Sequence, residues 1–269
     1  MDEVTGDRVM CAPMTKPARL SGKVALVTGA ARRVGRAIAV RLAEAGMDIA
    51  FTYNHSTDAA RTLKQEIETM GRRCLAVQAD NALPDAPATI FGAVTAYFDR
   101  LHVLVNNAST FDPTPFGQIT AETYDHNQAV NARTPLMLIQ HFAPMLAAHY
   151  DPADPASPGR VVNFIDIHVM GQPLRHYLAY NTSKAALLEI TSSCALELAP
   201  RVTVNAIAPG VVEWAENYST AERSDYMTRV PLARPGTPPD AAAAVLFLVD
   251  EGSYCTGQTI RLDGGRFLT

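Results

Sequence analysis

The chain alternates short apolar runs with longer stretches in which apolar residues recur at helical spacing. Residues 23–28 (KVALVT) are nearly all apolar, which is typical of a strand buried on both faces. Comparable runs predict further strands at residues 48–53, 73–78, 102–105, 160–165, 202–207 and 259–262. Segments with helical spacing separate them, at residues 36–45, 56–70, 84–98, 121–148 and 179–199. This alternation predicts an α/β fold with a doubly wound, seven-stranded parallel sheet and helices on both faces.

Two stretches fall outside the alternation. Residues 1–20 contain three acids and no continuous apolar run, so they are neither a signal peptide nor a membrane span, and a flexible N-terminal extension is expected. Residues 211–238 are irregular and follow a strand end, where open α/β sheets bind ligands, so a substrate lid is expected there. The Pro- and Asp-rich segment 150–159 has the length of a loop rather than of a linker. Residues 21–269 are therefore predicted to form a single domain.

Net charge and cysteine content bear on partners, metal binding and location rather than on the predicted fold. The net charge of −4 gives no reason to expect nucleic acid or an anionic membrane as a partner. The cysteines, at positions 11, 74, 194 and 255, are scattered without metal-like spacing, so no metal site is predicted. Cys74 and Cys194 fall in apolar segments and are expected to be buried, reduced thiols, which favours a cytoplasmic location.

Candidate chemistry begins with Tyr180 and Lys184, which lie four residues apart in a helical segment. That spacing places both side chains on one face of a helix, one turn apart. A lysine beside a tyrosine favours the phenolate, so the phenol is expected to exchange a proton near neutral pH. The match is common by chance and gains weight only from a second motif upstream.

The second motif is the segment TGAARRVG at residues 28–35, between the first strand and the first helix. Gly29 and Gly35, with Val34 between them, bracket a turn of the kind that seats a dinucleotide pyrophosphate on a helix N-terminus. Arg33 stands where such turns usually carry another glycine, so a cation would sit at the phosphates and reach towards the substrate. The alternative is a solvated arginine, but a cation there opposes the helix dipole by roughly 0.3–1 kcal/mol unless an anion binds. Together the two motifs predict hydride transfer from a nicotinamide.

The choice of nicotinamide cofactor depends on the end of the second strand. An NAD site would place an acid about 20 residues past the glycine turn. Here Asn54, His55 and Ser56 follow Tyr53, and their amide, imidazole and hydroxyl groups can donate to a 2′-phosphate that a carboxylate would repel. NADPH is therefore predicted. The nearest acid, Asp58, is assigned to the N-terminus of the following helix.

Two further strand ends supply polar groups for the same cofactor. Asp80 follows the third strand and is expected to accept a hydrogen bond from the adenine amino group. The fourth strand runs into Asn106, Asn107, Ala108 and Ser109, where small residues let the backbone approach the ribose. An ordinary turn is the alternative, but a place at the carboxyl end of a central strand favours the cofactor site.

With these motifs assembled, residues 20–269 resemble the short-chain dehydrogenase/reductase family. The matching positions are Thr28-Gly29, Asn106-Asn107-Ala108, Asn131, Tyr180-x-x-x-Lys184, Pro209-Gly210 and Asp263-Gly264-Gly265. The resemblance implies a Rossmann-like domain, with Pro209 and Gly210 at the cofactor, and a homotetramer formed through the two long helices. It also implies that Lys184 holds the nicotinamide ribose and that Asn131 supports Lys184 through water.

Within that family the chain is most similar to the pteridine reductases. Arg33 replaces the usual glycine, residues 107–116 resemble the loop of the pterin pocket, and Asp166 stands where carbonyl-reducing members carry a catalytic serine. A carboxylate there would repel the oxyanion formed on carbonyl reduction, whereas it can accept from the ring N–H and amino groups of a pterin. Reduction of a C=N bond also needs a proton on nitrogen, which Asp166 and Tyr180 could relay.

The predicted function is therefore NADPH-dependent reduction of a pterin, dihydropterin or dihydrofolate, with Tyr180 as proton donor. Substrate contacts are assigned to Arg33, Ser109, Phe111, Asp166, Tyr180 and Trp214, with Phe111 stacked on the pterin. Trp214, in the expected lid, either covers the substrate or packs within the lid. One alternative is a carbonyl or 3-oxoacyl reductase that tolerates the aspartate. Another is a non-catalytic NADPH-binding sensor, against which the complete set of Asn131, Tyr180 and Lys184 argues.

The position of Asp166 leaves a question open. It lies fourteen residues before Tyr180, one more than is usual in the family. Either the loop at residues 167–177 absorbs an extra residue, or the aspartate is displaced from the serine position. Asp166 could also serve only as a loop cap. His168 and His176, in the same loop, are expected at the surface or in packing.

Overall fold

The computed structural model describes residues 20–214 and 218–269 of the chain. The predicted N-terminal extension, apart from Leu20, lies outside the described residues, as does Cys11. Leu20 itself is buried in the core, immediately before the first strand. No helix among the described residues is long and apolar enough to cross a membrane.

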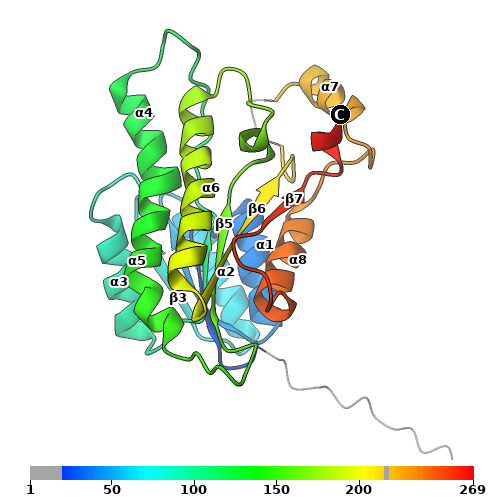
Figure 1. Cartoon of the computed structure of the whole chain (residues 1–269). Coiled ribbons are helices and arrows are strands. Elements are labelled where there is room, and N and C mark those ends of the chain that lie inside the picture. The colour runs from blue at the N-terminus through cyan, green and yellow to red at the C-terminus, as the bar shows by residue number, and fades with distance from the viewer. Residues whose placement is uncertain (1–19, 215–217) are drawn as a thin grey trace, which may run out of the picture.

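Seven parallel strands form one sheet in the order β3-β2-β1-β4-β5-β6-β7, which confirms the predicted fold (Figure 1). The strand order reverses beside β1, as in doubly wound folds that bind ligands at that point. The strands are β1 (Val24–Val27), β2 (Asp48–Tyr53), β3 (Cys74–Gln78), β4 (Val103–Asn106), β5 (Gly159–Phe164), β6 (Val202–Pro209) and β7 (Thr259–Leu262).

Helices cover both faces of the sheet, and each face has its own hydrophobic cluster. One cluster packs beneath α1 (Arg33–Glu44), α2 (Thr57–Thr69) and α8 (Pro238–Leu246). The other packs beneath α3 (Ala86–Tyr97), α5 (Thr134–Ala147) and α6 (Leu178–Leu198). Two further helices, α4 (Ala121–Gln128) and α7 (Thr220–Thr228), extend beyond the carboxyl ends of the strands (Figure 1).

The first strand shows why its sequence lacks polar positions. Val24 and Leu26 belong to one hydrophobic cluster, whereas Ala25 and Val27 belong to the other, and all four are fully buried. Alternate side chains of a strand point to opposite faces, so a strand covered on both sides must be apolar throughout. The predicted all-apolar strand is confirmed.

Four local features differ from the sequence-based expectation, and one of them is α8, a helix that the hydrophobic pattern did not predict. The helix predicted at residues 121–148 is interrupted by a π-helical turn, η1 (Ala129–Arg133), between α4 and α5. The first helix begins at Arg33 rather than at residue 36. The prediction that residues 211–238 are irregular throughout is wrong, because they contain α7.

A capping box explains the helix in the predicted lid. The Ser219 hydroxyl accepts from the Glu222 backbone N–H at 3.3 Å, and the Glu222 carboxylate accepts from the Ser219 N–H at 2.9 Å. This reciprocal pattern satisfies two N–H groups that a helix start otherwise leaves unpaired. The signal is visible in the sequence as S-x-x-E before the helix.

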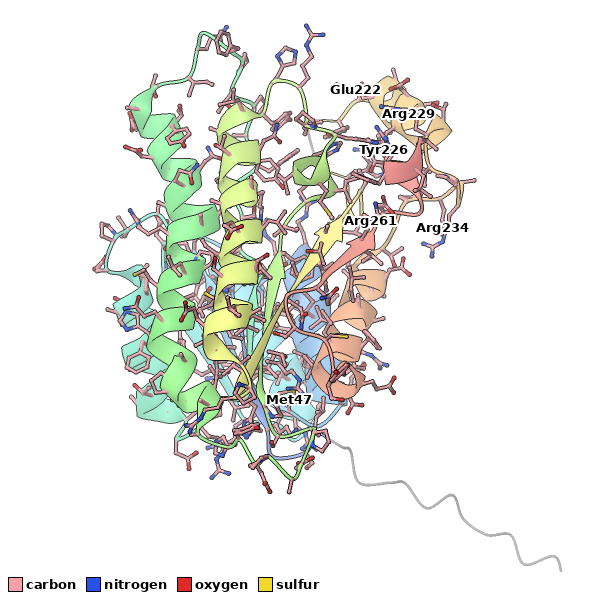
Figure 2. All side chains as sticks on the ribbon, viewed as in Figure 1. Met47, Glu222, Tyr226, Arg229, Arg234 and Arg261 are labelled. Atoms are coloured by element: carbon pink, nitrogen blue, oxygen red, sulfur yellow. The ribbon has the colours of Figure 1, made fainter. Side chains whose placement is uncertain are left out.

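The parallel sheet has two edges of different character. Figure 2 shows Tyr226 on α7 and Arg229 just after it, beyond the carboxyl edge of the sheet, and Met47, just before β2, at the amino edge. The turns that carry the predicted site residues follow β1 to β6, and all of them lie at the carboxyl edge.

Candidate active site

A cavity of about 830 Å³ opens at the carboxyl edge of the sheet. Among the residues that line it are all the predicted cofactor and substrate residues: Gly29, Arg33, Val34, Asn54, His55, Ser56, Asp80, Asn107, Ala108, Ser109, Phe111, Asp166, Tyr180, Lys184, Pro209, Gly210 and Trp214. Of the predicted site residues, only Asn131 does not line the cavity. The described residues offer no cluster of side chains suited to a metal ion.

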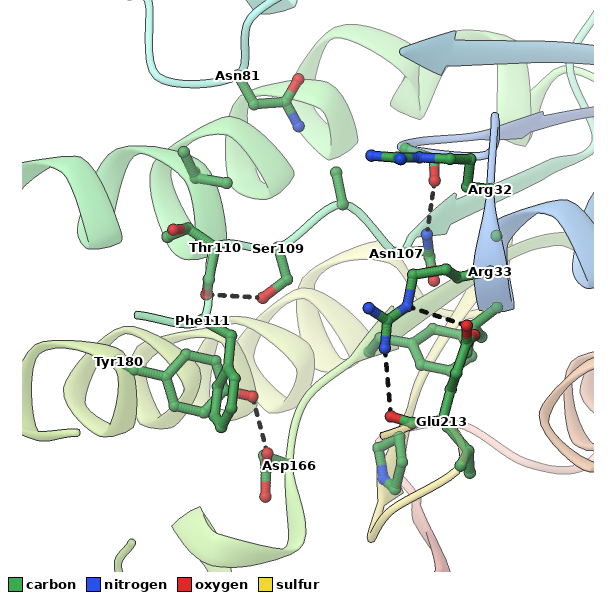
Figure 3. Close-up of a pocket in the computed structure, with 18 of the residues that line it drawn as sticks. Arg32, Arg33, Asn81, Asn107, Ser109, Thr110, Phe111, Asp166, Tyr180 and Glu213 are labelled. Atoms are coloured by element: carbon green, nitrogen blue, oxygen red, sulfur yellow. Dashed lines mark hydrogen bonds and ion pairs between the residues drawn. The ribbon is translucent and has the colours of Figure 1, made fainter. Parts of the chain in front are cut away.

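Tyr180 and Asp166 form the central contact of this cavity (Figure 3). The Tyr180 hydroxyl donates to Asp166 Oδ2 at 2.7 Å, and the tyrosine side chain is buried within the first turn of α6. The other oxygen, Oδ1, accepts from the His168 backbone N–H at 2.8 Å and caps the short helix η2 (Ile167–Met170). Asp166 is therefore a loop cap and a partner of the phenol at once.

The longer spacing before Tyr180 does not move Asp166 out of reach. The aspartate follows β5 by two residues, and the turn η2 and the loop after it cover the distance back to α6. In that loop His168 lines the cavity, and its Nδ1 lies 2.7 Å from the Gln172 carbonyl oxygen. His176 has a φ of +68° and lies in the loop just before α6.

Lys184 lies one turn beyond Tyr180, on the same face of α6, as predicted. Its Nζ donates to the Phe164 carbonyl at 2.7 Å and lies 5.9 Å from the centroid of the Tyr180 ring. The lysine is 2% exposed, and burial lowers its pKa to about 8, an effect that the Asp166 charge opposes.

The expectation that Lys184 favours the phenolate is not reflected in the direction of the Tyr180 pKa shift. Burial, and then the charge and hydrogen bond of Asp166, raise the pKa of Tyr180 well above its ordinary value. The Tyr180 hydroxyl donates the hydrogen bond and Asp166 accepts it, so the carboxylate disfavours loss of the phenol proton. The arrangement holds a proton on the tyrosine oxygen, beside a carboxylate.

Asn131 connects the site from behind. It is fully buried in the π-helical turn η1, where its Oδ1 accepts from the Thr110 N–H at 3.0 Å and its Nδ2 donates to Ser183 Oγ at 3.0 Å. These bonds join the loop after β4 to α6, beside Lys184. π-Helical turns are rare in proteins, but those that occur are often found at functional sites. No sequence pattern predicted this one.

Close packing explains both glycines of the turn after β1. Gly29 has a φ of +64°, and a Cβ there would lie 2.9 Å from Ala108 Cα. A Cβ on Gly35 would lie 2.5 Å from the Gly29 carbonyl oxygen and 2.6 Å from Asn107 Nδ2. The Thr28 hydroxyl accepts from the backbone N–H groups of Asn107 and Ala108, at 3.0 Å each. The turn and the loop after β4 are thereby locked together.

The N-terminus of α1 is suited to an anion. Its N-cap, Arg32, makes no side-chain capping bond, and its first turn holds no acid. The backbone N–H groups of a first helical turn have no partner within the helix, and residues 31–35 line the cavity. Arg32 is exposed beside them, a cation that the sequence analysis did not assign.

Arg33 contacts the predicted lid. It takes a φ of +58°, a conformation that favours glycine, in agreement with the residue usually found at this position. Its Nη2 donates to the carbonyls of Glu213 and Trp214 at 3.2 and 3.1 Å, and its Nε lies 3.3 Å from the Glu213 carboxylate (Figure 3). The guanidinium is thus engaged by the predicted lid rather than by solvent alone.

Aromatic rings form one wall of the cavity. Phe111 stacks on Tyr177 with centroids 4.5 Å apart and meets the edge of Tyr180 at 4.8 Å. Across the cavity, Trp214 meets Tyr218 and Tyr226 at 5.6 and 5.5 Å. The sequence analysis did not identify Tyr177, Tyr218 or Tyr226, because no motif marks them and the tertiary fold brings them together.

The groups at the far end of the cavity are polar. Asn54, His55 and Ser56 follow β2, and the Asn54 carbonyl accepts from Gln78 at 2.9 Å. Asp80 Oδ1 accepts from the Ala82 N–H at 2.9 Å. Among the described residues no hydrogen bond to Asp80 Oδ2 is seen, so this oxygen can accept from a ligand. The structure therefore brings the predicted adenosine-binding groups to one end of the cavity.

Replacing Asp166 with Asn should lower the pKa of Tyr180. The carboxylate charge and its hydrogen bond both raise that pKa, so removing the charge makes the phenol easier to ionise. For Asp166→Asn, the phenolate absorbance of Tyr180 is isolated by subtracting the absorbance of Asp166→Asn/Tyr180→Phe. For the wild type, it is isolated by subtracting the absorbance of Tyr180→Phe. The phenolate signal of Asp166→Asn should appear at lower pH than the wild-type signal. Identical titration curves would contradict the contact described here.

Comparisons with known proteins agree with this geometry. Residues 29–266 match the family model described as enoyl-(acyl carrier protein) reductase. The chain is 34% identical to the short-chain dehydrogenase/reductase FrzI of a Cladobotryum species, over 94% of this chain and 98% of the relative. It is also 34% identical to the 3-oxoacyl-[acyl-carrier-protein] reductase FabG of Staphylococcus aureus, over 91% of this chain and 98% of the relative.

Solved structures give the same result. A blue fluorescent protein from a metagenomic library, in complex with NADPH, superposes with a TM-score of 0.83 at 35% identity, over 92% of this chain and 99% of that chain. A short chain dehydrogenase from Burkholderia cenocepacia, in complex with NADP, superposes with a TM-score of 0.84 at 35% identity and the same coverage. This chain belongs to the short-chain dehydrogenase/reductase family of oxidoreductases.

Proposed function

We propose that this protein is an NADPH-dependent reductase that acts on the C=N bond of a pterin-like heterocycle. The observation that carries the proposal is the 2.7 Å hydrogen bond from Tyr180 to Asp166 in the wall of the cavity. It places a proton donor and a carboxylate acceptor side by side, which suits a substrate that bears several N–H groups.

The chain's residues fit a dinucleotide. The uncapped N-terminus of α1 would hold the pyrophosphate, and the loop of Asn107 and Ala108 would lie along the ribose. Lys184, already directed at the Phe164 carbonyl, would bond the ribose of the nicotinamide. When bound, NADPH supplies a hydride to the substrate. Pro209 and Gly210 would limit the cavity on the side of β6.

Cationic and neutral groups support NADPH over NADH. Asn54, His55 and Ser56 provide no carboxylate, and Arg32 adds a cation on the same side of the glycine turn. A guanidinium pairs well with a phosphate. The solved relatives named above carry NADPH or NADP, which agrees with this choice.

The proton would come from Tyr180. Its raised pKa keeps the phenol protonated throughout the physiological range, so the donor is always loaded. Asp166 would accept from a ring N–H or amino group of the substrate and share the phenol's proton. A carbonyl substrate would instead develop an oxyanion, which the Asp166 charge disfavours.

Reduction of a carbonyl or 3-oxoacyl substrate is the second candidate. It is favoured by the 34% identity to the 3-oxoacyl-[acyl-carrier-protein] reductase FabG. Asp166 is the residue that separates the two proposals.

Two expected substrate contacts need rearrangement to act. Phe111 has one face covered by Tyr177, so a pterin would stack on its other face. Arg33 would have to exchange its bonds to Glu213 for bonds to the substrate. Ser109 and Trp214 line the same part of the cavity and complete the proposed substrate pocket.

Assembly and location are also proposals. We infer a homotetramer formed through the long α4–η1–α5 segment and α6, which lie side by side on one face of the sheet (Figure 1). The support for it is the family resemblance. A cytoplasmic location stays a prediction from the sequence, as does the single domain at residues 21–269.

NADPH should bind at least tenfold more tightly than NADH, a difference of about 1.4 kcal/mol. Asn54→Asp should reduce this ratio by repelling the 2′-phosphate, and Arg32→Ala should reduce it by removing a cation. Fluorescence titration of both cofactors measures the ratio. Ser192→Asp, which adds the same charge on the exposed surface of α6, is the control and should leave it unchanged. Equal dissociation constants of the wild type for NADPH and NADH would contradict the proposed choice of cofactor.

Asp166→Ser should abolish pterin reduction and increase any weak turnover of ketones, because the charge that repels an oxyanion is gone. Tyr180→Phe should lower kcat for either substrate class by roughly 100-fold, the scale of a lost general acid. Steady-state NADPH oxidation measures both. If Asp166→Ser retains full pterin turnover, the carboxylate has no part in substrate choice and the argument from Asp166 fails.

A further inference from the structure

A second cavity, of about 190 Å³, lies at the opposite edge of the sheet from the candidate active site. It is formed where β1, β4 and β5 begin, and the loop between α5 and β5 closes it. These three strands are neighbours and parallel, so their amino ends meet at one edge. Polar and charged side chains dominate the lining: Lys23, His102, His149, Asp154, Ser157 and Arg160.

Arg160 is the unusual member of this group. It is only 3% exposed, and its Nη1 donates a hydrogen bond of 2.7 Å to the Pro158 carbonyl. Its Nε is buried without a hydrogen-bond partner. Among residues 20–214 and 218–269, no carboxylate lies within ion-pair distance of it. Burial lowers the pKa of Arg160, although the Asp154 charge opposes this.

A buried guanidinium without an ion-pair partner destabilises the folded state. Removing a charge from water costs several kcal/mol unless a partner compensates it. Buried polar groups without partners are few in native proteins, and an ion or a water often satisfies them. A guanidinium also presents a planar fork of donors that matches oxyanions.

Of the two histidines beside Arg160, His102 has its acceptor nitrogen occupied and its Nε2–H left as a donor. The Val24 backbone N–H donates to His102 Nδ1 at 3.0 Å, so the neutral ring carries its hydrogen on Nε2. Burial, followed by the charges of His149, Lys23 and Arg100, lowers the pKa of His102 to about 4, while Asp99 opposes the shift. His149 stacks on His102 with centroids 4.6 Å apart and planes inclined by 12°.

We propose that this second cavity is a binding site for a small oxyanion, with inorganic phosphate or sulfate as the fitting class. Arg160 brings a buried positive charge to the lining, and Asp154, the acidic residue among the lining residues, is exposed. The volume corresponds to roughly six water molecules at about 30 Å³ each, and it is below the range of about 300–1,000 Å³ usual for larger ligands. The site is independent of the proposed enzyme function.

The competing explanation is that Asp154 serves as the counter-ion of Arg160. Asp154 is exposed, and its Oδ1 accepts from the Ala156 N–H at 2.9 Å within its own loop. If it neutralises Arg160, removing its charge weakens the loop and any anion site there. If an external oxyanion neutralises Arg160, removing the Asp154 charge removes a repulsion and strengthens binding.

Histidine NMR on the full chain, labelled with ¹³C in its histidine rings, tests the proposal locally. Sodium phosphate and sodium sulfate are titrated against sodium chloride at constant ionic strength and constant pH. The ring signals of His102 and His149 should shift saturably, with a dissociation constant of about 1 mM or tighter. His126, which lines the first cavity, reports any binding there, and His141, stacked on Phe91, is the control that should not respond.

Two variants decide what neutralises Arg160. Asp154→Asn, at an exposed position, should tighten phosphate binding about two- to fivefold, the scale of one partly exposed charge pair. Arg160→Lys keeps the charge but loses the planar fork and should weaken binding by about tenfold. The proposal is overturned if the His102 and His149 signals fail to saturate, if chloride shifts them equally, or if Asp154→Asn weakens binding.

Discussion

Parallel pairing of the strands is the constraint on which the candidate site depends. In such a sheet every strand ends at the same edge, so the turn after β1, the loop after β4 and Asp166 after β5 meet although they are far apart in sequence. The helix α6 returns along the sheet and presents Tyr180 to that edge, within 2.7 Å of Asp166. A strand that reversed direction would carry its polar end away from the cavity.

Burial then determines the chemistry of the groups that meet there. Tyr180 and Lys184 are both withdrawn from water, which favours the neutral form of each, so the pKa of the phenol rises and that of the ammonium falls. Asp166 reinforces the first shift and opposes the second. The result is a phenol bonded to a carboxylate, and the proposed preference for substrates with N–H groups over substrates that become oxyanions rests on this pair.

Much of this was accessible from the sequence, for identifiable physical reasons. Apolar strands, helical spacing and glycine turns are local patterns, and they predicted the seven-stranded sheet and the residues that gather at its carboxyl edge. The helix α7 was missed although its capping box is also local. The direction of the Tyr180 pKa shift, the bonds from Arg33 to Glu213 and the buried Arg160 depend on contacts between distant segments, and spacing alone does not contain them.

The central claim is that the pair of Tyr180 and Asp166 selects a C=N substrate. The most direct test is kcat/KM of the wild-type protein for NADPH oxidation with a panel of pterins, dihydropterins, folates and simple ketones under identical conditions. The account predicts that a pterin or dihydropterin gives the highest value and that ketones are poor substrates. Efficient reduction of ketones, together with no turnover of any pterin or folate, would contradict it.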